Sequence, residues 1–446
     1  MRMSAALRRA VVPTALTLTV LLSGVLGCEE VQDAVNPDPD GSGAAFRVRI
    51  ENVSSAQPFT GSGVFNTPVG AAGPGPLAAG EAYEFGFTAG PGSRVSFATM
   101  FVQSNDLFYA PAEDGIALYD ASGAPTVGDV TDLVMLWDAG VEVNEEPGVG
   151  ANQAPRQAGP NTGDAEGGQV QLVADGFTYP AVADAIAVTV SKTSDADFSI
   201  RVANVSDGSV LLAPGVWVVH ADGAPLFAAG STDRGDGLEA LAEDGDPSGL
   251  GAALADDTGI AVIIAPGVWV LHTADGPLFT DGAPDRGLGL EALAEDGDPS
   301  ALAAALGGAM ALPHGGAFTT PVGAAGPAPA GPGGAYEFVV AAVPGARLSL
   351  ATMYVQSNDL FYGTDERGIA LFDQDGVALS GDVTSDIALW DAGSEVNEAP
   401  GFGPNQAPRQ AGPDTGADEG GAVRMVADAY DYGAVAESIR VSITAE

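Results

Sequence analysis

The sequence predicts an all-β protein that consists of two tandem antiparallel β-sandwiches. The chain holds 62 glycines and 31 prolines among 446 residues, a content typical of proteins with short strands and many turns. Apolar and polar residues alternate in several segments, which favours half-buried antiparallel strands. These segments are 46–53, 94–102, 186–192, 347–355 and 439–445. A long internal duplication divides the strands between two domains.

The duplication is visible in long strings of nearly identical residues. FATMFVQSNDLFY at 97–109 returns at 350–362 as LATMYVQSNDLFY, a spacing of 253 positions. The LWDAG and NQAPRQAGP strings return at the same spacing. The first strand also repeats, at 46–54 and 198–206, but here the spacing is only 152. The second copy is therefore expected to contain 101 extra residues between its first strand and the rest of the domain.

These extra residues contain a smaller tandem repeat. A GVWVVH string with Trp217 and His220 returns 52 positions later as GVWVLH, and LEALAEDGDPS follows each copy. Within 289–306 we expect a short helix that ends at Gly297, followed by a second helix that Asp298 caps. One copy of this helical unit should pack on the second sandwich, and the other should form an added lobe.

The sequence therefore predicts a chain of four parts. They are a signal peptide (1–27), a lipidated cysteine with a flexible tether (28–45), a first sandwich domain without the helical unit (46–193), and a second sandwich domain (198–446) with the duplicated segment at about 209–307.

The N-terminus has the pattern of a bacterial lipoprotein signal. Arg2, Arg8 and Arg9 precede an apolar stretch at 10–25, and a small residue stands directly before Cys28. Cys28 is the only cysteine of the chain, so a disulfide within the chain is excluded and lipidation is the simplest use for this thiol. The alternatives are a plain signal peptide or a membrane helix with an incidental cysteine. A lipid anchor would place the protein at the cell envelope, in the outer membrane or on the cell surface.

The charge balance excludes one class of partner. Acidic residues outnumber basic ones by 59 to 16, which gives a formal net charge of −43. A nucleic acid would be repelled by this surface, and no basic stripe is present to bind its phosphates. Most of the carboxylates are explained by a solvated, self-repelling surface. Adaptation to salty surroundings and capture of divalent cations are the functional alternatives.

The strings TMFVQSNDLF, LWDAGVEVN and GVW…H…GLEALAEDGDP together resemble the N-terminal domain of spondins. The resemblance covers the second predicted domain in full and about four-fifths of the first. It implies an antiparallel β-sandwich of roughly eight strands that binds calcium between loops at one end. The implied ligands are three acidic residues in each copy: Asp106, Asp138 and Glu142 in the first, and Asp359, Asp391 and Glu395 in the second.

Elementary chemistry is consistent with that ligand set. Calcium takes six to eight oxygen ligands, which loops supply readily. Gly140 permits a sharp turn that brings Asp138 and Glu142 together. This chain departs from the family where Glu142 and Glu395 replace an aspartate, and where leucine replaces a tryptophan that is common after the first aspartate. The alternative is that all of these are ordinary solvated loop acids.

Other candidate residues fit structural roles better than catalytic ones. His220 and His272 are expected to be structural partners of the nearby tryptophans. The polar segments 152–160 and 405–413, each with one arginine, would either brace the calcium loop or hold a carboxylate or sugar. No hydrolase elbow or phosphate-cradling loop is present, so an enzyme is not expected.

The sequence thus favours a non-enzymatic envelope lipoprotein with two calcium-binding domains. Its expected role is surface adhesion or interaction with matrix or envelope components. Its expected partners are the membrane, through the lipid anchor, and a glycan, matrix or surface protein. The alternative function is a calcium-dependent module that binds lipid or carbohydrate. Resemblance in fold does not transfer a specific ligand.

Overall fold

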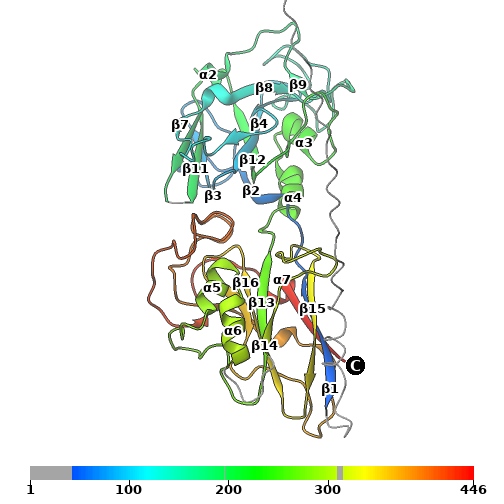
Figure 1. Ribbon diagram of the computed structural model, residues 1–446. Coiled ribbons are helices and arrows are strands. Elements are labelled where there is room, and N and C mark those ends of the chain that lie inside the picture. Colours follow the sequence, from blue (N-terminus) through cyan, green and yellow to red (C-terminus); the bar gives the residue numbers. More distant parts are fainter. Residues whose placement is uncertain (1–42, 195, 309–314) are drawn as a thin grey trace, which may run out of the picture.

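Two β-sandwiches lie end to end in the computed structural model, which describes residues 43–194, 196–308 and 315–446 (Figure 1). The upper one in Figure 1 is formed by residues 59–258, and the lower one by residues 44–54 together with 260–446. Because the first interrupts the second along the chain, we call them the inserted sandwich and the host sandwich. Strands outnumber helices, and all strands within the sheets pair antiparallel, which confirms the predicted all-β class.

The inserted sandwich packs a seven-stranded sheet against a four-stranded one. In order across the larger sheet, the strands are β2 (Phe59–Phe65), β12 (Leu212–His220), β4 (Arg94–Phe101), β5 (Leu107–Pro111), β8 (Val134–Asp138) and β9 (Gln171–Leu172), with β6 (Ile116–Ala117) beside β4. The smaller sheet has the order β3 (Ala82–Thr88), β11 (Asp197–Asn204), β10 (Ile186–Lys192) and β7 (Gly128–Asp129).

The host sandwich repeats this arrangement. Its larger sheet has the order β14 (Gly315–Phe318), β13 (Ile264–His272), β16 (Arg347–Tyr354), β17 (Leu360–Thr364), β20 (Ile387–Asp391) and β21 (Arg424–Met425), with β18 (Ile369–Ala370) beside β16. Its smaller sheet has the order β15 (Ala335–Ala342), β1 (Ala44–Asn52), β22 (Ile439–Ala445) and β19 (Gly381–Asp382).

Each sandwich also carries the same set of short helices. In the inserted sandwich these are η1 (Thr131–Leu133), α2 (Val182–Ala185), α3 (Leu238–Asp244) and α4 (Ser248–Asp256). In the host sandwich they are α5 (Leu290–Asp296), α6 (Ser300–Gly308), η2 (Thr384–Asp386) and α7 (Val435–Ser438). As predicted, α5 ends at Gly297, which adopts a left-handed φ of 67°, and the carboxylate of Asp298 accepts the N–H of Ser300 at 2.9 Å.

β1, the first strand of the chain, is part of the host sandwich, whose other strands all come from the second half of the chain. β1 pairs with β15 and β22 of the host sandwich, and its inward residues Phe46, Val48 and Ile50 are fully buried there. The similar strand β11 lies instead between β3 and β10 of the inserted sandwich. Without β11, the smaller sheet of the inserted sandwich would be split in two.

This pairing corrects the predicted domain boundaries. A domain at 46–193 would contain β1, which pairs elsewhere, and would lack β11 and β12. Neither sandwich lacks the helical unit, and neither has it twice. The duplicated segment at about 209–307 supplies one tryptophan-containing strand, β12 or β13, and one pair of helices to each sandwich. Each helix pair buries its apolar face on the larger sheet of its own sandwich. The prediction that one copy of the helical unit forms an added lobe was therefore wrong.

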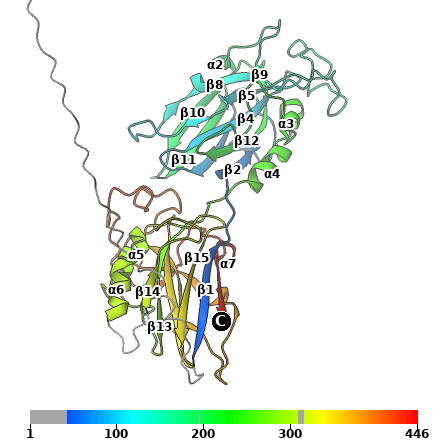
Figure 2. The same ribbon diagram turned by 45° about the vertical axis from the view of Figure 1, so that its right-hand side comes forward.

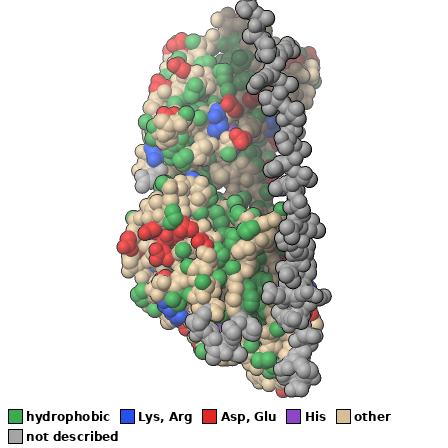
Figure 3. Space-filling model, in the orientation of Figure 1, with side chains coloured by type: hydrophobic (Ala, Val, Ile, Leu, Met, Phe, Trp, Pro, Cys, Tyr) green, Lys and Arg blue, Asp and Glu red, His purple; other side chains and the backbone are tan. Residues whose placement is uncertain are grey.

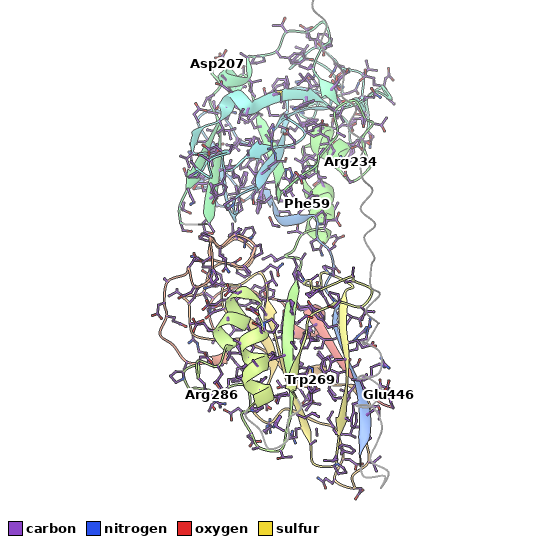
Figure 4. The ribbon with its side chains drawn as sticks, viewed as in Figure 1. Phe59, Asp207, Arg234, Trp269, Arg286 and Glu446 are labelled. Carbon is purple, nitrogen blue, oxygen red and sulfur yellow. The ribbon has the colours of Figure 1, made fainter. Side chains whose placement is uncertain are left out.

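The two passages of the chain between the sandwiches run side by side, as the blue and green connections in Figure 2 show. The N–H of Phe59 donates to the carbonyl of Asp257 at 3.2 Å, and the N–H of Gly259 donates to the carbonyl of Phe59 at 2.9 Å. Phe59 marks this junction at the base of the inserted sandwich in Figure 4. Adjacent ends are what allow one domain to be inserted into another.

The predicted signal peptide, Cys28 and the tether as far as residue 42 lie outside the described residues. The last two residues assigned to the tether, Ala44 and Ala45, already belong to β1. Among the described residues, no helix is both long and apolar enough to cross a membrane.

Candidate metal centre

Strand pairing brings Asp106 and Asp138 to the same end of the inserted sandwich. Asp106 stands directly before β5, and Asp138 is the last residue of β8. These strands are antiparallel, with Leu107 opposite Asp138, so the start of one meets the end of the other. The turn before β5 is fixed by Ser104, whose hydroxyl accepts the N–H of Leu107 at 3.1 Å and donates to the carbonyl of Phe101 at 2.6 Å.

Asp106 is a fully buried carboxylate with one unpaired oxygen. Its Oδ2 accepts the N–H groups of Val141 at 2.9 Å and Glu142 at 3.1 Å, whereas Oδ1 has no hydrogen-bond partner in the part of the chain that the structure describes. Burial, and then the negative charge of Asp138, raise the pKa of Asp106 to about 7. A buried unpaired carboxylate oxygen is costly unless a cation or a proton satisfies it. Asp106 therefore fits a metal ligand.

Asp138 is held beside it by the turn that the glycine permits. Its Oδ1 accepts the N–H of Gly140 at 2.7 Å, and its Oδ2 accepts the side-chain amide of Asn144 at 2.8 Å. Gly140 has a φ of 71°, and a Cβ there would come within 2.7 Å of the Gln169 backbone. No other residue fits this turn without strain. Burial also raises the pKa of Asp138.

The third carboxylate of the group is Glu166 and not the predicted Glu142. Oxygens of Asp106, Asp138 and Glu166 all lie within 4.8 Å of one another. The N–H of Glu166 donates to the carbonyl of Val141 at 2.9 Å, which folds the 163–168 loop over the site. Glu142 is turned away, because its Oε1 accepts the N–H of Gly163 at 2.7 Å and its Oε2 accepts the amide of Asn105 at 3.3 Å.

Glu166 gives the group an exposed edge. Its side chain is exposed, while Asp106 and Asp138 are buried. Burial, followed by the charges of Asp138 and Asp175, raises the pKa of Glu166. Asp138 thus raises the pKa of both Asp106 and Glu166, and such a concentration of negative charge favours a cation between the three carboxylates.

The equivalent group in the host sandwich contains an arginine. Asp359 and Asp391 occupy the same strand ends as their counterparts, and Oδ1 of Asp359 again lacks a hydrogen-bond partner among the described residues. However, Nη2 of Arg424 lies 2.7 Å from Oδ2 of Asp391 and 2.7 Å from Oε1 of Glu419, the counterpart of Glu166. The guanidinium therefore supplies positive charge between two of the three carboxylates.

One position accounts for this difference. Arg424 begins β21, and the residue in the same place at the start of β9 is the neutral Gln171. The two predicted sites therefore differ in charge, although the strand ends that carry their aspartates are the same. The inserted sandwich has an acidic group open to a cation, and the host sandwich has its own cation.

Glu395 does not join Asp359 and Asp391 either. Its Oε1 accepts the N–H of Gly416 at 2.5 Å, and its buried Oε2 has no hydrogen-bond partner among the residues that the structure describes. Burial, and to a smaller extent Glu398 and Asp414, raise its pKa. Glu395 therefore faces a different acidic neighbourhood, on the side of α5.

The polar segments around Arg156 and Arg409 brace the loops next to the site. Nη2 of Arg156 donates to Gln153 at 2.5 Å, and Gln153 in turn accepts the N–H of Gly148 at 2.9 Å and donates to the carbonyl of Glu146 at 2.9 Å. Arg409 makes the matching contacts in the host sandwich. These contacts favour the bracing role over the capture of an external carboxylate.

The two repeated histidines are structural, but their hydrogen-bond partners are not tryptophans. Nε2 of His220 lies 3.0 Å from the hydroxyl of Ser96, and Nδ1 lies 3.2 Å from the carbonyl of Asp222. His272 makes the same contacts with Ser349 and Ala274. Burial lowers the pKa of both imidazoles, so they are neutral core residues.

Neither protein-family models nor curated proteins match this chain. Its function is therefore inferred from the residues and their geometry.

Two features of the site were missed in the sequence. Glu166 stands in an irregular loop far along the chain from Asp138, and no strand pattern predicts its position. Its signal was the conservation of an acid in both copies, Glu166 and Glu419. The difference between Gln171 and Arg424 was visible once the copies were aligned at their spacing of 253.

Proposed function

We propose that this protein is a non-enzymatic, lipid-anchored envelope protein whose inserted sandwich binds one calcium ion through Asp106, Asp138 and Glu166. The observation that carries the proposal is the buried, unpaired Oδ1 of Asp106 within a group of three carboxylates. Calcium prefers carboxylate, carbonyl and water oxygens, and tolerates irregular geometry in loops. Affinity on the order of 10⁻⁴ to 10⁻³ M is expected for an extracellular module.

The spondin-type resemblance, the duplicated sandwich and the lipobox-like N-terminus together support a display function. Calcium would fix the loop end of the inserted sandwich, which points away from the host sandwich. In the host sandwich Arg424 does the same without an ion. Adhesion to a glycan, matrix or surface protein is the proposed role, with the lipid at Cys28 as the anchor.

A calcium titration of the full chain tests the metal site. Asp106→Asn and Asp138→Asn should each weaken binding at this site at least tenfold, because each removes a charged ligand. Asp359→Asn is the matched control and should leave that binding unchanged. The assignment of Asp106 and Asp138 as calcium ligands would be contradicted if Asp359→Asn weakened calcium binding equally, or if neither Asp106→Asn nor Asp138→Asn weakened it.

Binding to liposomes and to a glycan array, with and without chelator, tests the display role. Chelator-sensitive binding to glycan or protein, without binding to lipid, is expected. Chelator-sensitive binding to lipid alone would favour the lipid-binding alternative instead.

A further inference from the structure

The host sandwich carries a second acidic group, away from Asp359 and Asp391. Glu291 and Glu295 stand one turn apart on α5, so both face the same side of this helix. Asp414 reaches them from the loop that follows the bracing segment. One carboxylate oxygen from each of the three lies within 4.8 Å of the others. Figure 3 shows acidic side chains gathered on this side of the host sandwich.

Two buried oxygens at this place lack hydrogen-bond partners among the described residues. Glu295 is 2% exposed, and its Oε1 is unpaired. Glu395 is 3% exposed, and its Oε2 is unpaired. Burial is the main cause that raises the pKa of Glu295 to about 8, and the charges of Glu395 and Glu291 raise it further. An acidic surface alone would not bury carboxylates in this way.

The group lines a pocket of about 310 Å³. Five carboxylates border the pocket, and its other lining residues are alanine, serine and glycine. The five are Asp285, Glu291, Glu295, Asp414 and Asp418. The charges that raise the pKa of Glu291 are all negative, after burial as the main cause. The pocket therefore combines room for an ion and its waters with uncompensated negative charge.

The inserted sandwich has an amide in place of one of the three carboxylates at this position. Its Glu243 is as buried as Glu295, has an Oε1 without a hydrogen-bond partner among the described residues, and has a pKa that burial raises to about 8. Asn161 stands where the host has Asp414, and both adopt a left-handed backbone with φ of 52° and 53°. With its amide nitrogen turned to the helix, Asn161 donates to Oε1 of Glu239 at 2.5 Å and to Oε2 of Glu243 at 3.2 Å. An ionised aspartate has no hydrogen to donate, so Asp414 adds charge where Asn161 relieves it.

We infer that Glu291, Glu295 and Asp414 bind a hard divalent cation, with calcium as the probe, at a site separate from Asp106 and Asp138. Oxygen ligands of this kind, completed by water, suit calcium. The two sandwiches thus bind one ion each, but at different places. In each sandwich the other acidic group has a donor from within the chain, Arg424 in the host sandwich and Asn161 in the inserted one. Oδ1 of Asp359 and Oε1 of Glu243 still have no hydrogen-bond partner among the described residues.

Calcium titration of the full chain by calorimetry tests this inference, with circular dichroism to verify folding. The wild type should bind two ions. Asp414→Asn reproduces the Asn161 arrangement at the same backbone angle and should remove one ion, and Glu295→Gln should do the same. Asp106→Asn should remove the other ion, and the double variant with Asp414→Asn should bind neither.

The outcomes separate the two sites. If Asp414→Asn and Glu295→Gln leave the wild-type stoichiometry unchanged, the group is held by shared protons and the inference is overturned. If these variants lose one ion while Asp106→Asn loses none, the inference stands and the proposed site in the inserted sandwich fails.

Discussion

The side-chain amide of Asn52 donates to the carbonyl of Val262 at 2.8 Å, although 210 residues separate them along the chain. The same nitrogen donates to the carbonyl of Ala330 at 3.0 Å. Asn52 ends β1, and Val262 stands just before β13. Their hydrogen bond therefore joins the two segments of the host sandwich that precede and follow the inserted sandwich along the chain. Asn204 makes the equivalent bonds in the inserted sandwich, to Leu77 and Val210.

Replacing Asn52 should therefore destabilise the host sandwich. Asn52→Ala leaves the carbonyl of Val262 without its donor, whereas the carbonyl of Ala330 keeps the N–H of Ile264 at 3.1 Å. One unpaired buried carbonyl costs about 1–3 kcal/mol. Thermal unfolding should show a transition that moves to lower temperature, with Asn204→Ala acting on the inserted sandwich in the same way. Val69→Ala, at an exposed site, is the control. An unchanged unfolding profile for Asn52→Ala would show that the stability of the host sandwich does not depend on this hydrogen bond.

The insertion predicts which fragment of the chain folds alone. A fragment of residues 57–259 contains every strand of the inserted sandwich and should unfold cooperatively. A fragment of residues 46–193 lacks β11 and β12 and should not, because its smaller sheet is interrupted. Heteronuclear NMR spectra of the two fragments test this directly. Dispersed spectra from 46–193 and collapsed spectra from 57–259 would refute the topology.

Stability without metal should decrease as the pH rises from about 4 to about 8. Asp106 titrates at about 7 in the folded state, above its ordinary value, so the folded state binds more protons in this window and loses stability as they leave. Glu295, at about 8, extends the window upward. Urea denaturation in chelator at several pH values measures the decline, to which each of these residues contributes on the order of 4 kcal/mol at most.

General repulsion between the many carboxylates also lowers the stability as the pH rises. Variants of single residues are therefore needed to isolate the contributions of Asp106 and Glu295. Asp106→Asn and Glu295→Gln should each make the decline shallower, and added calcium should do so in the wild type. If both variants retain the full wild-type slope, these residues do not cause it.

Lipidation at Cys28 is a separate prediction. Cells fed radioactive palmitate should label the wild-type protein, and Cys28→Ser should abolish the label and release the protein from the membrane fraction. Cys28→Ser should fold normally, because β1 begins only at Ala44. Label that persists in Cys28→Ser would exclude this anchor.

The strands and the duplication could be predicted because both leave a periodic trace. β10 and β22 occupy the expected ranges, and α5 ends at the expected glycine. The assignment of β1 and β11 could not be predicted by the same means. Their sequences are so similar that either would fit either sheet, and only the pairing of distant strands decides between them.

The candidate site was predictable only where the backbone repeats. Asp106 and Asp138 lie at strand ends, so the strand pattern places them together. The family resemblance implies Glu142 as a ligand, but the turn at Gly140 directs it towards Gly163 instead. Glu166 depends on a loop whose conformation has no periodic signature.

The most direct test of this account exchanges Gln171 and Arg424, the residues that distinguish the acidic group of Asp106 and Asp138 from that of Asp359 and Asp391. Gln171→Arg should place a guanidinium beside Asp138 and abolish calcium binding in the inserted sandwich. Arg424→Gln should open the group of Asp359, Asp391 and Glu419 to calcium, so that titration detects one additional ion. If Gln171→Arg still binds calcium as the wild type does, and Arg424→Gln gains none, these carboxylates are not cation ligands.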